Sequence, residues 1–110
     1  MKNRIERINQ LIRERVAEIL LRDIFVRGSL ITVQEVSTSK DLNHAKIKVS
    51  VMPFFESVKV MKILEKQAPI IQAKLNSVVR MKFVPRIKFI IDRSEEKAGK
   101  VEEILRSIKR

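Results

Sequence analysis

The stretch KQAPIIQAKLNSVVRMKFVPRIKFII, residues 66–91, decides the fold, because a helical pattern in it gives way to a strand pattern. Its first apolar residues recur with the three-and-four spacing of one helix face: Ile71, Leu75 and Val78. Its last apolar residues alternate with basic ones, as on a half-buried strand: Ile87, Phe89 and Ile91. Pro85 puts that strand at a sheet edge or a bulge. The stretch predicts a helix from about Pro69, then a strand over residues 81–92.

Helical spacing also covers residues 56–68, with Val60, Ile63 and Leu64 on one face. Proline has no amide hydrogen and its ring clashes with the preceding helical turn. We therefore predict a structural kink at Ala68 and Pro69. It either separates two helices, 56–68 and 70–79, or bends a single one.

The rest of the chain supplies a leading helix, two strands and a closing helix. Residues 5–24 have helical apolar spacing, with Asn3 as a cap and Gly28 as a possible end. Residues 30–37 and 44–52 have strand patterns, and a polar turn between them predicts an antiparallel hairpin. Ser94 can cap a last helix over about residues 95–110.

The predicted order is helix, strand, strand, helix, kink, helix, strand, helix. It indicates one α+β domain over residues 1–110, with a three-stranded sheet and the helices on one face. Strand, two helices and strand form the core of KH-type RNA-binding modules, and the leading helix and strand indicate the second KH topology, type II. The Gly-x-x-Gly loop of standard KH modules is absent, because Gly28 and Gly99 are the chain's two glycines.

Positive charge is concentrated in the opening stretch. The 110 residues carry a formal net charge of +11, and residues 66–91 contain basic residues but no acidic one. A concentrated positive field on a small folded domain is typical of a polyanion binder, which favours nucleic acid over a small substrate. The predicted RNA-binding residues lie on two strands and the second helical region: Lys46, Lys48, Lys66, Lys74, Arg80, Lys82, Arg86 and Lys88.

Aromatic residues are few, with five Phe and no Tyr or Trp. Phe83 and Phe89 fall in apolar patterns and are expected in the core. Because single-strand binders stack bases on exposed rings, this composition favours recognition of RNA backbone and shape over base stacking.

Other functional classes find little support in the sequence. It has no cysteine and one histidine, His44, so we expect no metal site, no cofactor and no catalytic residue. Ser39, Asp41 and His44 lie close together, but they fall in the predicted turn, where Asp41 is expected to accept backbone hydrogen bonds. With no apolar run of about 20 residues and no signal-peptide pattern, we expect a soluble cytoplasmic monomer with no membrane contact.

Two segments resemble motifs of the bacterial ribosome-binding factor A family. One is VSTSKDLNHAK at residues 36–46, and the other is VPRIKF at residues 84–89, followed by DRS at residues 92–94. The order and spacing of these motifs and the length of the chain agree with the family pattern, so the resemblance covers essentially the whole chain. The chain departs from the family pattern in IFVR at residues 24–27, where Asp-Pro-Arg-Leu is common, and in QAP at residues 67–69, where the family's kink carries Ala-x-Gly.

The resemblance implies a type II KH-like fold with a kinked helix pair in place of the glycine loop. It also implies a bacterial ribosome assembly factor without enzymatic turnover. Such a factor binds the free small ribosomal subunit and its rRNA and assists late rRNA maturation. Two alternatives stay open: a general KH-like RNA- or DNA-binding protein, and a basic module that binds an acidic protein.

Overall fold

The computed structural model describes residues 3–94, and the predicted C-terminal helix lies outside this range. The predicted order of elements is confirmed within it. The elements are α1 (Arg4–Asp23), β1 (Leu30–Thr38), β2 (His44–Met52), the short 3-10 helix η1 (Phe54–Glu56), α2 (Ser57–Val78) and β3 (Arg86–Ile91).

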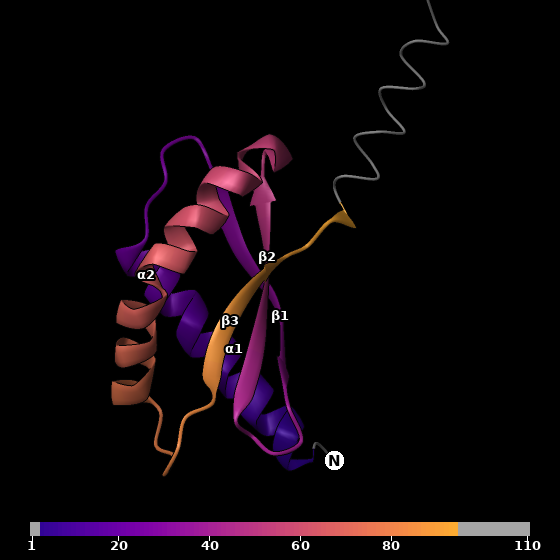
Figure 1. Cartoon of the computed structure of the whole chain (residues 1–110), viewed down its shortest axis with the longest axis vertical. Helices are drawn as coiled ribbons and strands as arrows, with labels where there is room; N and C mark the ends of the chain where they lie inside the picture. The colour runs from indigo at the N-terminus through magenta and orange to yellow at the C-terminus, as the bar shows by residue number, and fades with distance from the viewer. Residues whose placement is uncertain (1–2, 95–110) are drawn as a thin grey trace, which may run out of the picture.

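The three strands form one mixed sheet in the order β1-β2-β3 (Figure 1). β1 pairs with β2 in antiparallel register, with a bulge between Val33 and Glu35. β2 pairs with β3 in parallel, so that His44 lies opposite Arg86 and Ala45 opposite Ile87. A parallel pair needs a crossover connection, which α2 supplies by carrying the chain from one end of the sheet back to the other.

Both helices pack on the same face of the sheet, as the sequence predicts. The strands bury one set of alternating side chains. On β2 the buried residues are Ala45, Ile47, Val49 and Val51. α1 packs against β1, α2 packs against β3, and the two helices contact each other. The fold is therefore a two-layer α+β arrangement whose second sheet face is uncovered by any element within residues 3–94.

α1 forms where the apolar spacing predicts it, but it ends earlier than Gly28. The Asn3 side chain caps its start by accepting a hydrogen bond from the Glu6 amide at 2.9 Å. The helix ends at Asp23, and Gly28, with a φ of 83°, instead lies in the turn that leads to β1. The Asn9 side chain then ties the helix to the sheet, because its Oδ1 accepts from the Thr38 amide at 3.0 Å and the Thr38 hydroxyl at 2.5 Å.

α2 continues through Pro69 as a single 22-residue helix, so of the two forms of the kink the structure excludes a pair of separate helices. In Figure 1 the first half of α2 slants across the sheet and the second half runs nearly parallel to the long axis. A 22-residue helix is about 33 Å long, and a nine-residue strand is about 30 Å long. The helix is thus only slightly longer than the strands, so one continuous helix can pack along most of the sheet, and Pro69 lies on the exposed side of the helix.

One side chain of α2 covers the start of the outer edge of β3. The Gln72 amide nitrogen donates to the Pro85 carbonyl at 3.1 Å, and its oxygen accepts from the Ile87 amide at 2.8 Å. These are the two bonds that a further strand would make there. β3 begins at Arg86, later than the predicted residue 81, because the buried Pro85 cannot donate to the ladder.

Gln72→Ala is expected to destabilise the protein by about 1–3 kcal/mol, because it leaves a partly buried amide and carbonyl without partners. Gln67→Ala is the matched control, since Gln67 is also half-buried on α2 but makes no side-chain hydrogen bond within residues 3–94. Urea unfolding of both variants measures the difference. Equal stability of the two variants would show that the Gln72 bonds contribute nothing.

Candidate nucleic-acid interface

The uncovered sheet face carries four of the eight predicted RNA-binding residues. Lys46 and Lys48 project from β2, and Arg86 and Lys88 project from β3, at the positions that alternate with the buried ones. The parallel register places Lys46 directly beside Lys88, and Arg86 beside His44. Neighbouring strands lie about 4.8 Å apart, and alternate residues of a strand about 6.6 Å apart. The four cations thus form a compact grid.

This grid is electrostatically unfavourable in the isolated protein. Like charges directly opposite each other on neighbouring strands destabilise a sheet, and Lys46 faces Lys88 in this way. Lys48 is partly compensated, because its Nζ lies 3.9 Å from Glu35 Oε2 on β1. A bound polyanion would turn the remaining repulsion into attraction, which is why we regard this face as the candidate interface.

The loop between α2 and β3 extends the basic surface at one end of the sheet. Arg80 and Lys82 are both exposed in it and lead directly to Arg86. Phe83 is 76% exposed, so its predicted place in the core is wrong, whereas Phe89 is buried as predicted. The Lys82 ammonium lies 5.8 Å from the centroid of the Phe83 ring, within range of a cation–π interaction. The loop therefore offers an exposed ring among cations.

Sequence periodicity misassigned Phe83 because the residue falls in the same apolar pattern as the strand. Phe83 lies outside the core because β3 begins only at Arg86. Phe83 lies between Lys82 and the Val84-Pro85 pair, and this position could have indicated that it is not in the strand. A proline two residues on weakens a strand assignment.

Lys66 and Lys74 lie away from the grid, on α2. Lys66 is exposed, while Lys74 Nζ makes an ion pair of 2.9 Å with Asp23 Oδ2 at the end of α1. The Lys74 hydrogen bond lowers the pKa of Asp23 below its ordinary value, with a smaller contribution from Arg22. Part of the Lys74 charge thus serves to join the two helices, a pairing between residues distant in the sequence.

The turn that contains Ser39, Asp41 and His44 is held together by its own hydrogen bonds. Asp41 Oδ1 accepts from the Ser39 hydroxyl at 2.6 Å and from the Asn43 amide at 3.0 Å, which confirms the predicted role of Asp41. These two bonds lower the pKa of Asp41, the Ser39 hydroxyl contributing most. Ser39 Oγ also accepts from the backbone amide of His44 at 3.1 Å. Both hydrogen bonds of the Ser39 hydroxyl therefore stabilise the turn.

The described part of the chain, residues 3–94, contains no group of three or more His, Cys, Asp or Glu side chains that could hold a metal ion. Neither of its helices is long and apolar enough to cross a membrane.

Solved structures with the same arrangement support the fold assignment. The crystal structure of ribosome-binding factor A from Thermus thermophilus superposes with a TM-score of 0.71 at 24% identity, covering 84% of this chain and 100% of that one. A Thermus thermophilus ribosome-binding factor A homology model, fitted into a cryo-EM map of a 30S–RbfA complex, gives a TM-score of 0.67 at 26% identity. That match covers 77% of this chain and 91% of the other. The fold and the open basic face define the chain as a KH-like α+β domain.

Sequence comparison then gives the family. The family model for ribosome-binding factor A matches residues 4–105. Ribosome-binding factor A of Dictyoglomus thermophilum is 41% identical over 112 residues, which covers 99% of this chain and 91% of the relative. The Synechocystis sp. protein is 33% identical over 109 residues, covering 96% and 82%. The chain belongs to the ribosome-binding factor A family, a bacterial family of ribosome-binding factors and not an enzyme family.

Asp23→Asn is expected to lower stability at neutral pH by a small, salt-sensitive amount, because it removes the carboxylate that pairs with Lys74. The folded-state pKa of Asp23 is lowered from 3.8, so the ion pair stabilises the folded state fully above that pH. The contribution is lost as the pH falls through the lower folded value.

Urea unfolding of both proteins across a pH series measures this. The stability difference should shrink below pH 3.8 and vanish at the acid end of the series, where the carboxyl is protonated in both states. A difference that persists unchanged at the lowest pH would assign the effect of the substitution to something other than the Asp23 charge.

Proposed function

We propose that the protein binds the free small ribosomal subunit through its open sheet face and assists late maturation of small-subunit rRNA. Membership of the ribosome-binding factor A family supports this. So does the Thermus thermophilus relative, whose coordinates were fitted into a 30S–RbfA map. The observation that carries the proposal is the grid of Lys46, Lys48, Arg86 and Lys88 on a face that no described element covers.

The geometry of the grid suits an RNA backbone. The ladder fixes the strand positions of the cations, so the Cα framework needs no ordering when a phosphate row arrives. Each phosphate that is neutralised releases counterions, which makes the binding strong at low salt and independent of sequence. Arg86 can bind a phosphate through two parallel hydrogen bonds, and the lysines act as point charges.

The loop at the end of the grid adds a second kind of contact. Arg80 and Lys82 would extend the electrostatic track, and the exposed Phe83 ring would stack on an unpaired base. RNA recognition would therefore combine backbone contacts, which the composition favours, with a limited contribution from base stacking. A ring at the end of a phosphate track prefers RNA in which one base is splayed out.

Assistance in maturation follows from this preference without catalysis. A protein that binds one local RNA conformation more tightly than another shifts the population toward it by the difference in binding free energy. The proposed action is to hold a late, otherwise minor conformation of small-subunit rRNA until the rest of the particle fits around it. Residues Lys66 and Lys74 would contribute least, since they lie outside the grid.

The protein is expected to sediment with free small subunits in a sucrose gradient and to be depleted from translating ribosomes. The measurement is the amount of protein per small-subunit rRNA in each fraction, with a Lys46→Ala/Lys88→Ala variant as the binding-impaired control. Equal occupancy of free subunits and polysomes would contradict the assembly role. Sedimentation with total RNA would favour a general RNA binder, and salt-sensitive association with an acidic protein alone would favour the protein-binding alternative.

A further inference from the structure

His44 lies at one corner of the basic grid, on the same open face of the sheet. It is the first residue of β2, its side chain is exposed, and it alternates with buried residues in the same way as Lys46. The parallel register places it directly opposite Arg86 on β3. Neighbouring strands lie about 4.8 Å apart and alternate residues of a strand about 6.6 Å apart, so two permanent cations flank His44 at the spacing of the grid itself.

Backbone hydrogen bonds fix the position of His44. Its amide donates to Ser39 Oγ at 3.1 Å, and its carbonyl accepts from the Ser39 amide at 2.8 Å, which closes the turn between β1 and β2. The Asn43 carbonyl accepts from the Arg86 amide at 2.9 Å, so the start of β3 is held beside the start of β2. The Cα atoms of His44 and Arg86 therefore have a fixed spacing, and no ordering of the backbone is needed to bring both side chains to one ligand.

Most of the charged side chains around His44 are cations. Arg86 faces it from β3, and Lys46 follows it on β2. The turn that precedes β2 adds the exposed Lys40. The loop between α2 and β3 adds two more exposed cations at this end of the sheet, Arg80 and Lys82. An imidazole that takes up a proton here adds positive charge to a surface that repels it, because like charges on facing strands are unfavourable.

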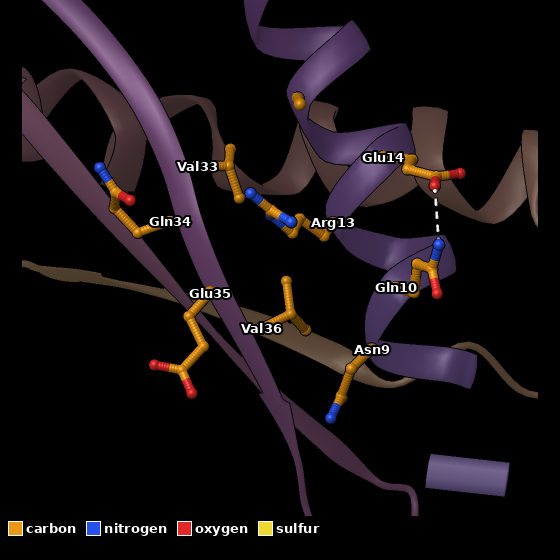
Figure 2. Close-up of a pocket in the computed structure, with 9 residues that line it drawn as sticks. Asn9, Gln10, Arg13, Glu14, Val33, Gln34, Glu35 and Val36 are labelled. Atoms are coloured by element: carbon orange, nitrogen blue, oxygen red, sulfur yellow. Dashed lines mark hydrogen bonds between the residues drawn. The ribbon is translucent and has the colours of Figure 1, made fainter. Parts of the chain in front are cut away.

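Acidic side chains compensate little of this charge. Glu35 points away from α1 (Figure 2), but its partner is Lys48, with Nζ and Oε2 3.9 Å apart. Lys48 is four residues beyond His44, about 13 Å along the strand. The carboxylate that interacts with the His44 charge is Asp41, whose pKa is lowered chiefly by the Ser39 hydroxyl, with His44 making the smallest contribution. His44 itself makes no ion pair within residues 3–94.

A bound phosphate row would reverse the energetics of a proton on His44. In the isolated protein the neighbouring cations repel a protonated imidazole, whereas phosphates beside it would attract the same charge. Binding free energies are reciprocal, so a proton that favours RNA binding is itself favoured by bound RNA to the same extent. Histidine changes its charge between about pH 5 and pH 8, a range in which lysine and arginine keep theirs. RNA affinity should therefore rise as the pH falls through this range.

We propose that His44 is a further RNA-contacting residue of the open face and makes RNA binding stronger as the pH falls from about 8 to about 5.5. One backbone phosphate would lie between His44 and Arg86, where the arginine fork binds two of its oxygens and the imidazolium N–H donates to the same group. The inference rests on the proposed function, because it takes the grid as the RNA interface. His44 is the chain's one histidine, so the response has a single side chain as its source.

The test measures the affinity of the full chain for small-subunit rRNA at fixed ionic strength, at about pH 8 and about pH 5.5. The wild type is expected to bind about three- to tenfold more tightly at the lower pH, as one added charged contact would give. Its slope of log affinity against log salt should steepen by roughly 0.7–0.9, because one more phosphate is neutralised. Asp41 keeps its charge at both pH values, since its pKa is lowered from 3.8, so it cannot supply this response.

Two substitutions of the exposed His44 separate its charge from its shape. His44→Gln keeps a hydrogen-bonding side chain that does not titrate, and should show the same affinity at both pH values. His44→Arg is charged throughout, and should bind at both pH values as tightly as the wild type does at the lower one. Lys40→Gln, on the same turn, removes a cation outside the grid and should keep the pH response of the wild type. Urea unfolding at both pH values verifies that each variant is folded.

An equal pH response in the wild type and in His44→Gln would overturn the inference, because the proton would then act elsewhere. So would a wild type whose affinity is the same at both pH values. Either result leaves the proposed function standing, provided that Arg86→Ala/Lys88→Ala still weakens binding. Undiminished affinity of that double variant would overturn the proposed function and this inference with it.

Discussion

The parallel pairing of β2 with β3 is the constraint on which the rest of the structure depends. It obliges the chain to return from the end of β2 to the start of β3, and α2 makes that crossing along one face of the sheet. α1 then packs beside α2 on the same face, and the side chains of both helices complete one core with the buried half of each strand. A three-stranded sheet covered in this way has one face left for solvent or for a ligand.

That uncovered face explains how a small domain holds so much charge. Lys46, Lys48 and Lys88 need no buried partner, because the pleat directs them away from the core while their neighbours fill it. The same alternation that stabilises the fold therefore builds the grid. Only the mutual repulsion of the cations opposes it, and the Lys48–Glu35 pair offsets a small part of that repulsion. A bound phosphate row would offset the remainder.

Regular patterns in the sequence predicted the elements well where one face of each is buried. The alternation over residues 44–52 gave β2 with its observed bounds, and the helical spacing of Ile8, Ile12 and Val16 gave the buried face of α1. Alternation also predicted β3 and its basic outer face, although the predicted start at residue 81 was too early. Four of the eight candidate residues could be grouped on one surface in this way, because strand period alone fixes which side they share.

Features that depend on contacts between distant residues could not be predicted. The Asp23–Lys74 ion pair and the Gln72 bonds to β3 need the tertiary arrangement of α2 before they can be recognised. Phe83 looked like a core residue because the chain around it is apolar, yet the loop carries it outward. Pro69 predicted a kink but not which of its two forms the chain takes, and α2 takes the continuous form because its packing on the sheet outweighs the loss of a single amide donor.

The most direct test of the basic face is the salt dependence of binding to small-subunit rRNA. Arg86→Ala/Lys88→Ala should flatten the slope of log affinity against log salt by about one to two units, because each lost phosphate contact removes roughly 0.7–0.9. Lys59→Ala/Lys62→Ala removes the same charge from the exposed side of α2 and should leave the slope nearly unchanged. An unchanged slope in the folded Arg86/Lys88 variant, or an equal change in both variants, would contradict the account.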